Sequence, residues 1–340
     1  MKKGLLAAVL FAACAQLALA AGAFDGAADW LEEAITSGRL VSVSLENEVG
    51  TPPPEPSPDT EPLYTAALTI TERDVLPSPS PVPEETPEIR EATIYSDLDI
   101  DNATSFEIDP AALMSEGLSL ELPADGPQVL IVHTHGTESY TMEPGYEYTE
   151  SDYARTTDCE HNMIAVGDVL AAALEAQGLT VLHDRGLYDY PSYTGSYDRS
   201  GAAVQSYLAQ YPDIAIVIDL HRDAIGDGDV VYKTKAEIPN ESSSQIMLLV
   251  GTGENGLSHP NWRENMKLAL LMQESAESKY PTLMRPLAVR QERYNQQLTT
   301  GSLIIEVGSN GNTLREAMTA VELFADAVGP ALLELVAGGE

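Results

Sequence analysis

Basic residues are scarce in this chain of 340 residues: 18 Lys and Arg stand against 53 Asp and Glu, a formal net charge of −35. So acidic a surface repels nucleic acids and anionic membrane faces, because both carry negative charge of their own. We therefore expect no nucleic-acid partner. More than half of the excess negative charge lies in residues 25–125, which indicates a solvated acidic segment in that part of the chain.

Cysteines are also few. The chain has only Cys14 and Cys159, and Cys14 lies inside an N-terminal apolar run, so no disulfide is expected between the two. The cysteine content alone therefore does not indicate the compartment in which the protein works.

Charge is absent from the N-terminal segment after Lys2 and Lys3, and the apolar run that follows is interrupted only by Gln16. Because about 20 apolar residues span a bilayer, residues 1–24 are interpreted as a single-pass signal-anchor that leaves the rest of the chain outside the cytoplasm. The alternative is a cleaved signal peptide with Ala18-Leu19-Ala20 as its small-residue cleavage site, followed by secretion.

Proline gathers in residues 51–59 and 78–87, among serines and acids. Such segments bury too little apolar surface to form a core and favour extended, polyproline-like conformations. We therefore interpret residues 25–90 as an acidic, Pro-rich, disordered stalk, and residues 91–340 as the folded domain.

Beyond residue 90 the hydrophobic pattern alternates between two periodicities. It predicts strands at 129–132, 179–183, 214–219, 230–233, 246–250 and 303–307, and helices at 162–177, 200–210, 261–278 and 313–335. Gly178 is a plausible helix C-cap, and Thr313 with Glu316 makes a capping box. Strand–helix alternation predicts an α/β fold with a mostly parallel sheet flanked by helices.

Polar residues follow three of these strands at the point where the apolar run stops. His133, His135 and Glu138 come after the strand at 129–132. In an open α/β sheet, ligands bind at the carboxyl ends of the strands. Imidazole nitrogens and carboxylate oxygens are zinc ligands, and a catalytic zinc site keeps one position for water. The alternative is a pair of surface histidines in a polar turn.

His221 follows the apolar run that ends at Leu220. Asp219 or Asp223 can accept its second ring N–H and so fix the tautomer, as metal-bound histidines usually require. Arg222 is a candidate to stabilise an oxyanion or to hold a substrate carboxylate, and the alternative is a salt bridge to Asp219 or Asp223.

Glu306 ends the apolar run 301–305. A carboxylate at the mouth of a hydrophobic strand has a raised pKa, which suits a general base that takes a proton from zinc-bound water. The alternative is a carboxylate favoured by the dipole of the following helix.

A loop rich in Tyr, Ser and Gly at 189–197 is of a kind that contacts sugars and peptides. No Gly-x-Ser-x-Gly elbow surrounds Ser196 or Ser200 to make either a nucleophile.

Several blocks in a fixed order resemble the stage II sporulation protein P family, peptidoglycan hydrolases of spore-forming Firmicutes. The resemblance runs from about Glu91 to the C-terminus. Its blocks are VLIVHTHGTESY (129–140), residues 162–178, HDRGLYDYPSYTGSYDRS (183–200), IDLHRDA (218–224) and IIEVGSN (304–310). It implies a fold like that of the zinc-dependent N-acetylmuramoyl-L-alanine amidases. It also implies cleavage of the amide between muramic acid and L-alanine, and of peptide cross-links.

The resemblance further implies a place and a partner. The family acts during engulfment of the forespore, in the septal space between mother cell and forespore, with other engulfment proteins. Its partner is stage II sporulation protein D, a lytic transglycosylase. A peptidoglycan substrate and attachment to the membrane through the N-terminal segment complete this expectation.

Roles carried over from the related amidases make His135 the first Zn²⁺ ligand, with His133 in reserve, and His221 the second. Glu306 matches the catalytic base, in a Glu-x-Gly context. The carboxylate ligand is expected to be Glu138, with Glu160 and then Asp158 as alternatives. Two rival functions stay open: a non-catalytic peptidoglycan-binding or scaffold protein on the same fold, and a zinc carboxypeptidase.

Overall fold

The computed structural model describes residues 87–96, 100–226 and 229–337. All of these lie in the second of two compact units, residues 70–340. The expected anchor (1–24) and the expected stalk as far as residue 86 lie outside the described residues. Within the described ranges, none of the helices combines the length and the apolar character needed to cross a membrane.

A seven-stranded sheet forms the centre of the domain, in the order β2-β8-β7-β9-β5-β3-β4. Neighbouring strands pair in parallel except β7 with β9, which are antiparallel. The predicted mostly parallel sheet is therefore confirmed. The strands are β2 (Ile100–Asn102), β3 (Val129–Val132), β4 (Val181–His183), β5 (Ile216–Asp223), β7 (Ile246–Gly251), β8 (Leu287–Arg290) and β9 (Gly301–Ser309).

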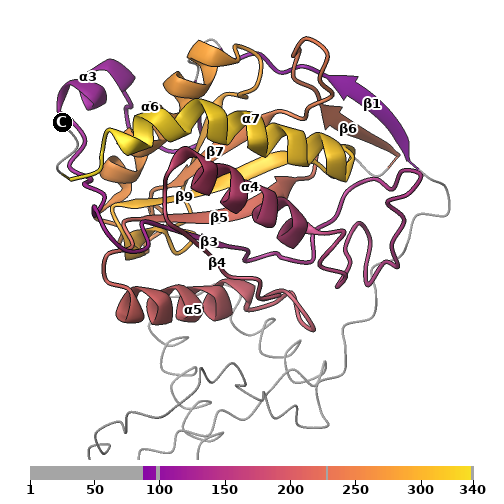
Figure 1. Cartoon of the computed structure of the whole chain (residues 1–340), viewed down its shortest axis with the longest axis horizontal. Coiled ribbons are helices and arrows are strands. Elements are labelled where there is room, and N and C mark those ends of the chain that lie inside the picture. Colours follow the sequence, from indigo (N-terminus) through magenta and orange to yellow (C-terminus); the bar gives the residue numbers. More distant parts are fainter. Residues whose placement is uncertain (1–86, 97–99, 227–228, 338–340) are drawn as a thin grey trace, which may run out of the picture. The chain divides into compact units, whose positions relative to one another are not determined.

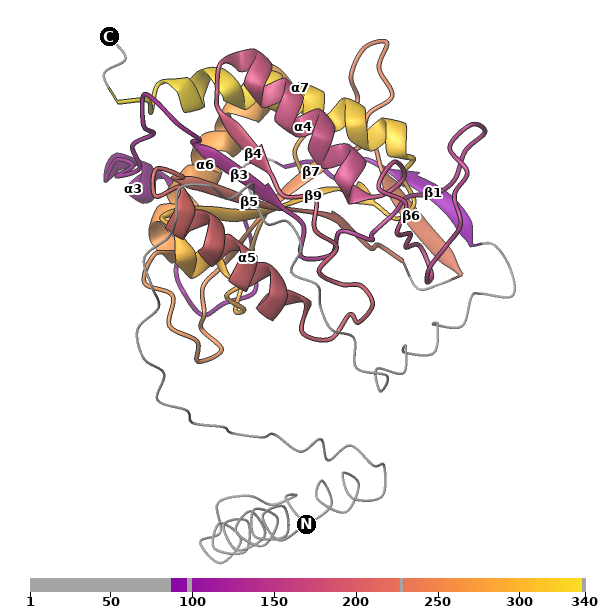
Figure 2. The ribbon, with the colours of Figure 1, turned by 60° about the horizontal axis from the view of Figure 1, so that its bottom comes forward.

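Helices cover both faces of this sheet, as predicted. Figures 1 and 2 show α4 (Met163–Gln177) and α7 (Leu314–Leu333) side by side on one face, and α5 (Ser196–Gln210) on the other. The larger core cluster joins one face of the sheet to α4, α7 and α6 (Trp262–Lys279). A smaller cluster packs Val204 of α5 against Leu130, Val132 and Val217 of the sheet.

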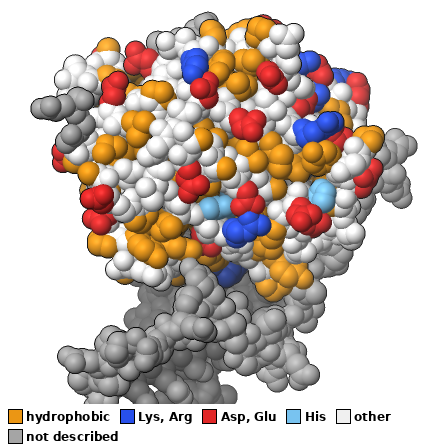
Figure 3. Space-filling view, viewed as in Figure 1, with side chains coloured by type: hydrophobic (Ala, Val, Ile, Leu, Met, Phe, Trp, Pro, Cys, Tyr) orange, Lys and Arg blue, Asp and Glu red, His pale blue; other side chains and the backbone are white. Residues whose placement is uncertain are grey.

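Smaller elements lie at the margins of the domain. β1 (Glu88–Ala92) pairs in parallel with β6 (Val230–Thr234) as a separate two-stranded sheet. A short helix α3 (Pro110–Ser115) and a 3₁₀ turn η1 (Gln296–Leu298) complete the described elements. Acidic, basic and apolar side chains are interspersed on the face shown in Figure 3.

Both predicted helix-end signals are confirmed. Gly178 ends α4 with φ of 110°, a left-handed conformation that favours glycine. The Thr313 hydroxyl accepts from the backbone N–H of Glu316, and the Glu316 carboxylate accepts from the backbone N–H of Thr313. Both hydrogen bonds of the capping box are therefore present. Glu316 also pairs with Lys233 of β6 at 2.8 Å, which ties the start of α7 to the margin of the domain.

Three predicted boundaries were wrong near the site. β5 and β9 continue beyond their predicted ends to Asp223 and Ser309, because the ladder between the two strands continues after the apolar run has stopped. His221 therefore lies within a strand, as Glu306 was predicted to do, and backbone hydrogen bonds hold both strands. α5 begins at Ser196 rather than at residue 200, directly after Gly195 with φ of 81°. β1, β2 and β8 were not predicted, because each is short and β1 and β2 are largely exposed.

We expect Glu316→Ala to lower the free energy of unfolding by about 2 kcal/mol, because it removes a cap and leaves Lys233 Nζ with Glu91 as its one remaining carboxylate partner among the described residues. Urea unfolding of the full chain measures this. Glu322→Ala, an exposed position on the same helix, is the matched control and should change stability by less than about 0.5 kcal/mol. Equal effects of the two variants would contradict the assignment.

Candidate metal centre

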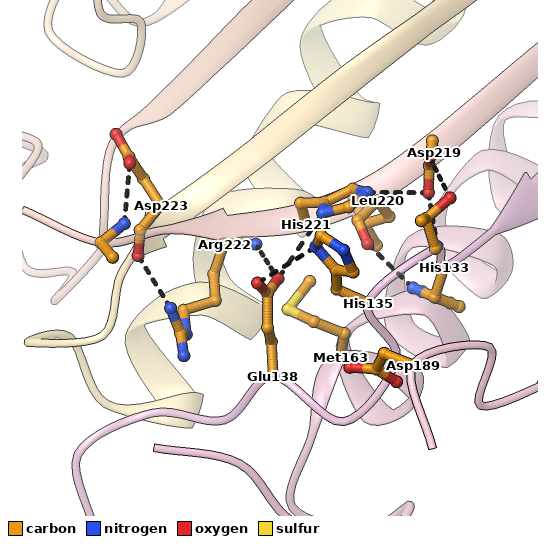
Figure 4. Close-up of polar contacts among 12 residues, drawn as sticks. His133, His135, Glu138, Met163, Asp189, Asp219, Leu220, His221, Arg222 and Asp223 are labelled. Carbon is orange, nitrogen blue, oxygen red and sulfur yellow. Dashed lines mark hydrogen bonds and ion pairs between the residues drawn. The ribbon is translucent and has the colours of Figure 1, made fainter. Parts of the chain in front are cut away.

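Three chain segments bring the candidate residues together at the carboxyl ends of the central parallel strands. His135 and Glu138 lie in the turns after β3, and His221 lies near the end of β5. β9 pairs beside β5, with Glu306 opposite His221 in the register. Figure 4 shows Glu138 reaching towards the rings of His221 and His135.

His135, Glu138 and His221 form one compact, buried group. One ligand atom from each lies within 4.8 Å of the other two. Glu138 Oε1 is 3.6 Å from His135 Nδ1, and Glu138 Oε2 is 3.6 Å from His221 Nδ1. The two imidazoles and one carboxylate thus converge on one point, which is the donor set of a three-ligand zinc site.

The outward nitrogen of each ring has its own partner. His221 Nε2 lies 2.9 Å from Asp219 Oδ1, and His135 Nε2 lies 3.2 Å from Ser196 Oγ. Asp219 is itself held by the backbone N–H and the hydroxyl of Thr134, at 2.7 and 2.6 Å. Such outer partners orient metal-binding histidines, and of the two predicted partners for His221 the structure has Asp219.

The charges around this group favour a cation. Burial raises the pKa of Glu138, but contacts with His135 and His221 hold it well below its usual range. Burial lowers the pKa of His221, but the carboxylates of Asp219 and Glu138 raise it well above its ordinary value. Two buried carboxylates therefore stabilise positive charge between them, which is the electrostatic requirement for holding a divalent metal ion.

Glu306 has a different environment. Its Oε2 is buried and has no hydrogen-bond partner within the described part of the chain. Burial raises the pKa of Glu306 to about 8; His221 has a smaller effect that lowers this pKa, and the carboxylate of Glu138 has a smaller effect that raises it. The side chain therefore keeps a proton near neutral pH, as the apolar strand around it predicts.

Arg222 does not face the centre. Its guanidinium donates to the backbone carbonyls of Ser139 and Ala154, each at 2.8 Å, and of Asp223 at 3.3 Å. The alternative to the predicted oxyanion role, a salt bridge from Arg222 to Asp219 or Asp223, is not found among the described residues, and the Asp223 carboxylate pairs with Arg285 instead. Arg222 thus braces the loops around the centre, and only its backbone N–H reaches Glu138, at 3.3 Å.

His133 also lies outside the group. β3 ends at Val132 and the chain then turns, so His133 and His135 do not share a direction. His133 Nδ1 bonds to the Leu220 carbonyl at 3.0 Å, and its Nε2 lies 2.7 Å from His183 Nε2. Burial and the neighbouring His183 lower the pKa of His133 to about 3.

The alternative carboxylates are likewise absent from the group. Asp158 and Glu160 are exposed, and Asp158 bonds to His161 at 3.0 Å. Of the three carboxylates considered from the sequence, the structure brings only Glu138 to the two histidines.

Sequence reasoning missed Arg155, which lies in the long loop between β3 and α4. Its Nη2 is 3.3 Å from Glu138 Oε1, its Nη1 pairs with Asp189, and its guanidinium lies 5.0 Å from the ring centre of Tyr193. The ring of Tyr193 in turn stacks on His135, with centroids 4.6 Å apart. An arginine in an irregular polar loop carries no periodic signal, so nothing in the sequence marked it.

The fold and this group define an α/β protein with a candidate three-ligand metal centre at the carboxyl ends of its central parallel strands. The chain belongs to the stage II sporulation protein P family, whose model matches residues 71–329. Stage II sporulation protein P of Bacillus subtilis (strain 168) is 33% identical over 213 residues, which cover 58% of this chain and 49% of that protein. The chain thus spans about half the length of this curated relative.

Solved structures of amidases are also similar to this chain. The N-acetylmuramyl-L-alanine amidase Ami1 of Mycobacterium smegmatis is 13% identical, with 63% of this chain and 98% of that one covered, at a TM-score of 0.37. The CwlD amidase of Clostridioides difficile, solved in complex with the GerS lipoprotein, is 13% identical, with coverage of 61% and 98% and a TM-score of 0.38.

We expect Glu306→Gln to stabilise the metal-free protein in a pH-dependent way. Because the folded-state pKa of Glu306 is raised from 4.5 to about 8, the wild type loses stability as pH rises through that interval. The glutamine does not ionise, so the variant should equal the wild type at pH 4 and exceed it at pH 8 to 9 by roughly 4 kcal/mol or about 10 °C in Tm.

Thermal unfolding in chelator at a series of pH values measures this difference. Glu175→Gln, at an exposed position on α4, is the matched control and should follow the wild type throughout. A constant difference between the Glu306 variant and the wild type at all pH values would contradict the buried, raised-pKa environment.

Proposed function

We propose that this protein is a zinc-dependent peptidoglycan hydrolase that cleaves the amide between N-acetylmuramic acid and L-alanine, and peptide cross-links. The observation that supports this most is the convergence of His135, Glu138 and His221, with the buried carboxyl group of Glu306 on the neighbouring strand. Membership in the stage II sporulation protein P family agrees with it.

The residues of this group fit a zinc ion. Two imidazole nitrogens and one carboxylate oxygen are zinc donors, and three protein ligands leave a position for water or substrate. Zinc bound by such ligands supplies Lewis acidity, polarising a carbonyl and lowering the pKa of bound water. Asp219 and Ser196 hold the two rings with their inner nitrogens directed at the shared point.

Glu306 is assigned the proton transfers of the amide hydrolysis. It accepts the proton that the attacking water gives up, and it delivers a proton to the nitrogen of the leaving amine. The unpartnered Oε2 is the atom for this task, because no protein hydrogen bond within the described residues competes for it. A divalent metal ion bound beside Glu306 would lower the pKa of its carboxyl group, so that the carboxylate is ionised to accept this proton and can then return it.

Arg155 replaces Arg222 in this proposal as the cation beside the centre. Its contact with Glu138 Oε1 orients that carboxylate, and its pairing with Asp189 fixes its own position. Arg222 acts only through the loops that it braces.

The cellular setting is proposed from the family. We place the protein in forespore engulfment, attached to the membrane by residues 1–24 with its folded domain in the space between mother cell and forespore. A lytic transglycosylase like stage II sporulation protein D is its proposed partner, because removal of stem peptides prepares the glycan for such an enzyme.

The zinc content of variants tests whether Glu138, rather than Glu160, is the carboxylate ligand. We expect the full chain to bind about one zinc ion and Glu138→Ala to lose most of it. Mutation of a residue that only hydrogen-bonds to a metal ligand lowers metal affinity roughly 10- to 100-fold, and removal of a ligand itself should lower it at least as much. Glu160→Ala is the matched control and should keep its zinc. Elemental analysis after dialysis measures both, and loss of zinc from the Glu160 variant alone would overturn the assignment.

Digestion of peptidoglycan sacculi by the full chain tests the activity, with products resolved by mass spectrometry. We expect free stem peptides from the zinc-loaded wild type, none in chelator, and a fall of roughly 100- to 10,000-fold for Glu306→Gln with its zinc retained. Glu175→Gln serves as the control of unchanged activity.

The other products have distinct meanings. Stem peptides still joined to glycan but freed of cross-links would move the assignment to endopeptidase, and loss of terminal residues alone would indicate a carboxypeptidase. Binding to sacculi without cleavage under any metal condition would contradict the hydrolase and favour a peptidoglycan-binding protein.

A further inference from the structure

Two exposed tyrosine rings lie on the loop between β4 and α5, and one of them, Tyr193, stacks on the candidate ligand His135. Tyr190 is 48% exposed and Tyr193 is 54% exposed, which is unusual for large aromatic side chains. The Tyr193 ring stacks on His135 at 4.6 Å between centroids, with the rings inclined by 26°. Even with this contact and that of Arg155, more than half of Tyr193 remains open to a ligand that approaches the centre.

The loop that carries these rings is held in one conformation by its surroundings. Arg199 of α5 donates to the backbone carbonyls of Tyr188, Ser192 and Thr194. At the other side, Asp189 accepts from the backbone N–H and the hydroxyl of Thr137. These hydrogen bonds fix the backbone of the loop before a ligand binds, so binding to its rings costs little conformational entropy of the loop.

The same hydrogen bonds exclude one common way of binding a peptide. A peptide that adds to a protein by strand pairing needs free backbone groups on its partner. Here Arg199 occupies three carbonyls of the loop, and the Tyr193 carbonyl accepts from the N–H of Ser196 at 3.2 Å. The loop offers exposed parts of two tyrosine side chains instead, with their phenol hydroxyls.

Ring faces with hydroxyls at their edge suit a saccharide. One face of a pyranose ring consists of C–H groups, which pack on an aromatic ring, while its hydroxyl groups hydrogen-bond at the rim. The short distance between Tyr193 and His135 puts such a sugar next to the bond held at the metal centre.

We propose that Tyr193 and Tyr190 form a saccharide-binding shelf, which holds a sugar ring of the glycan adjoining the scissile bond. The shelf favours amides that are attached to a sugar over cross-links between sugar-free peptides. The inference rests on the proposed function and names the part of the substrate that the site recognises.

Binding of peptide-free glycan tetrasaccharides to the full chain tests the shelf without any dependence on catalysis. We expect the wild type to bind, and Tyr193→Ala to bind roughly three- to tenfold more weakly, with Tyr190→Ala weakened in the same direction. Tyr193→Phe should keep most of the affinity, because the ring face remains. Tyr95→Ala is the matched control, because Tyr95 is 58% exposed and lies just after β1.

Titration calorimetry, or NMR where the affinity is low, measures these differences. Equal affinity of wild type and Tyr193→Ala for the tetrasaccharide, or no binding by the wild type, overturns the shelf. Because the probe carries no cleavable amide, the shelf and the hydrolase assignment succeed or fail separately.

A second measurement separates recognition from an indirect effect through His135. Steady-state rates are compared for a sugar-linked stem peptide and for a cross-linked peptide dimer without sugar. We expect Tyr193→Ala to raise KM for the first substrate, so that kcat/KM falls roughly three- to tenfold more for the first substrate than for the second. Equal losses on both substrates, with or without loss of zinc, would show that the ring acts through the metal centre and would overturn the shelf.

Discussion

The parallel pairing of β3, β5 and β9 is the constraint on which the candidate metal centre depends. The carboxyl ends of neighbouring parallel strands lie at the same edge of a sheet. Residues that are far apart in the chain therefore lie close together there, and short side chains are enough to bring them into contact. The register puts Val132 beside Asp219 and His221 beside Glu306. A slip of one residue in either pair would turn these side chains to the opposite face.

Burial of charge is the second requirement, and the structure meets it by mutual compensation. Glu138, Asp219 and His221 are all buried, and an isolated charge in such a place would be expensive. Contacts of 2.9 to 3.6 Å between them share the charge, and Thr134 satisfies the remaining acceptors of Asp219. Glu306 Oε2 has no such partner among the described residues, and burial raises the pKa of this carboxyl group, so that it keeps its proton near neutral pH. One cluster therefore contains carboxylates prepared to hold a cation and a carboxyl group prepared to exchange a proton.

The loops around the centre divide the remaining tasks. The guanidinium groups of Arg222 and Arg199 donate to backbone carbonyls, so these two arginines stabilise the loops around the metal centre. Arg155, Tyr193, Ser196 and Tyr197 contact the ligand group itself. The last three lie in or next to the loop that its Tyr, Ser and Gly content marked in the sequence, whereas Arg155 lies in an irregular loop and was overlooked.

Local features could be predicted from the amino-acid sequence: the strand and helix periodicities, the Gly178 and Thr313 caps, and the polar residues that follow the apolar strands. These features depend on neighbours within a few positions. They already marked His133, His135, Glu138, His221 and Glu306 as candidates, and the family resemblance ranked His135 before His133. Which of these groups meet depends on the tertiary structure. It separated His133 from His135, kept Asp158 at the surface and turned Arg222 to backbone carbonyls. Those outcomes depend on strand register and on loops that cross between elements, and such long-range contacts leave no periodic trace in a single sequence.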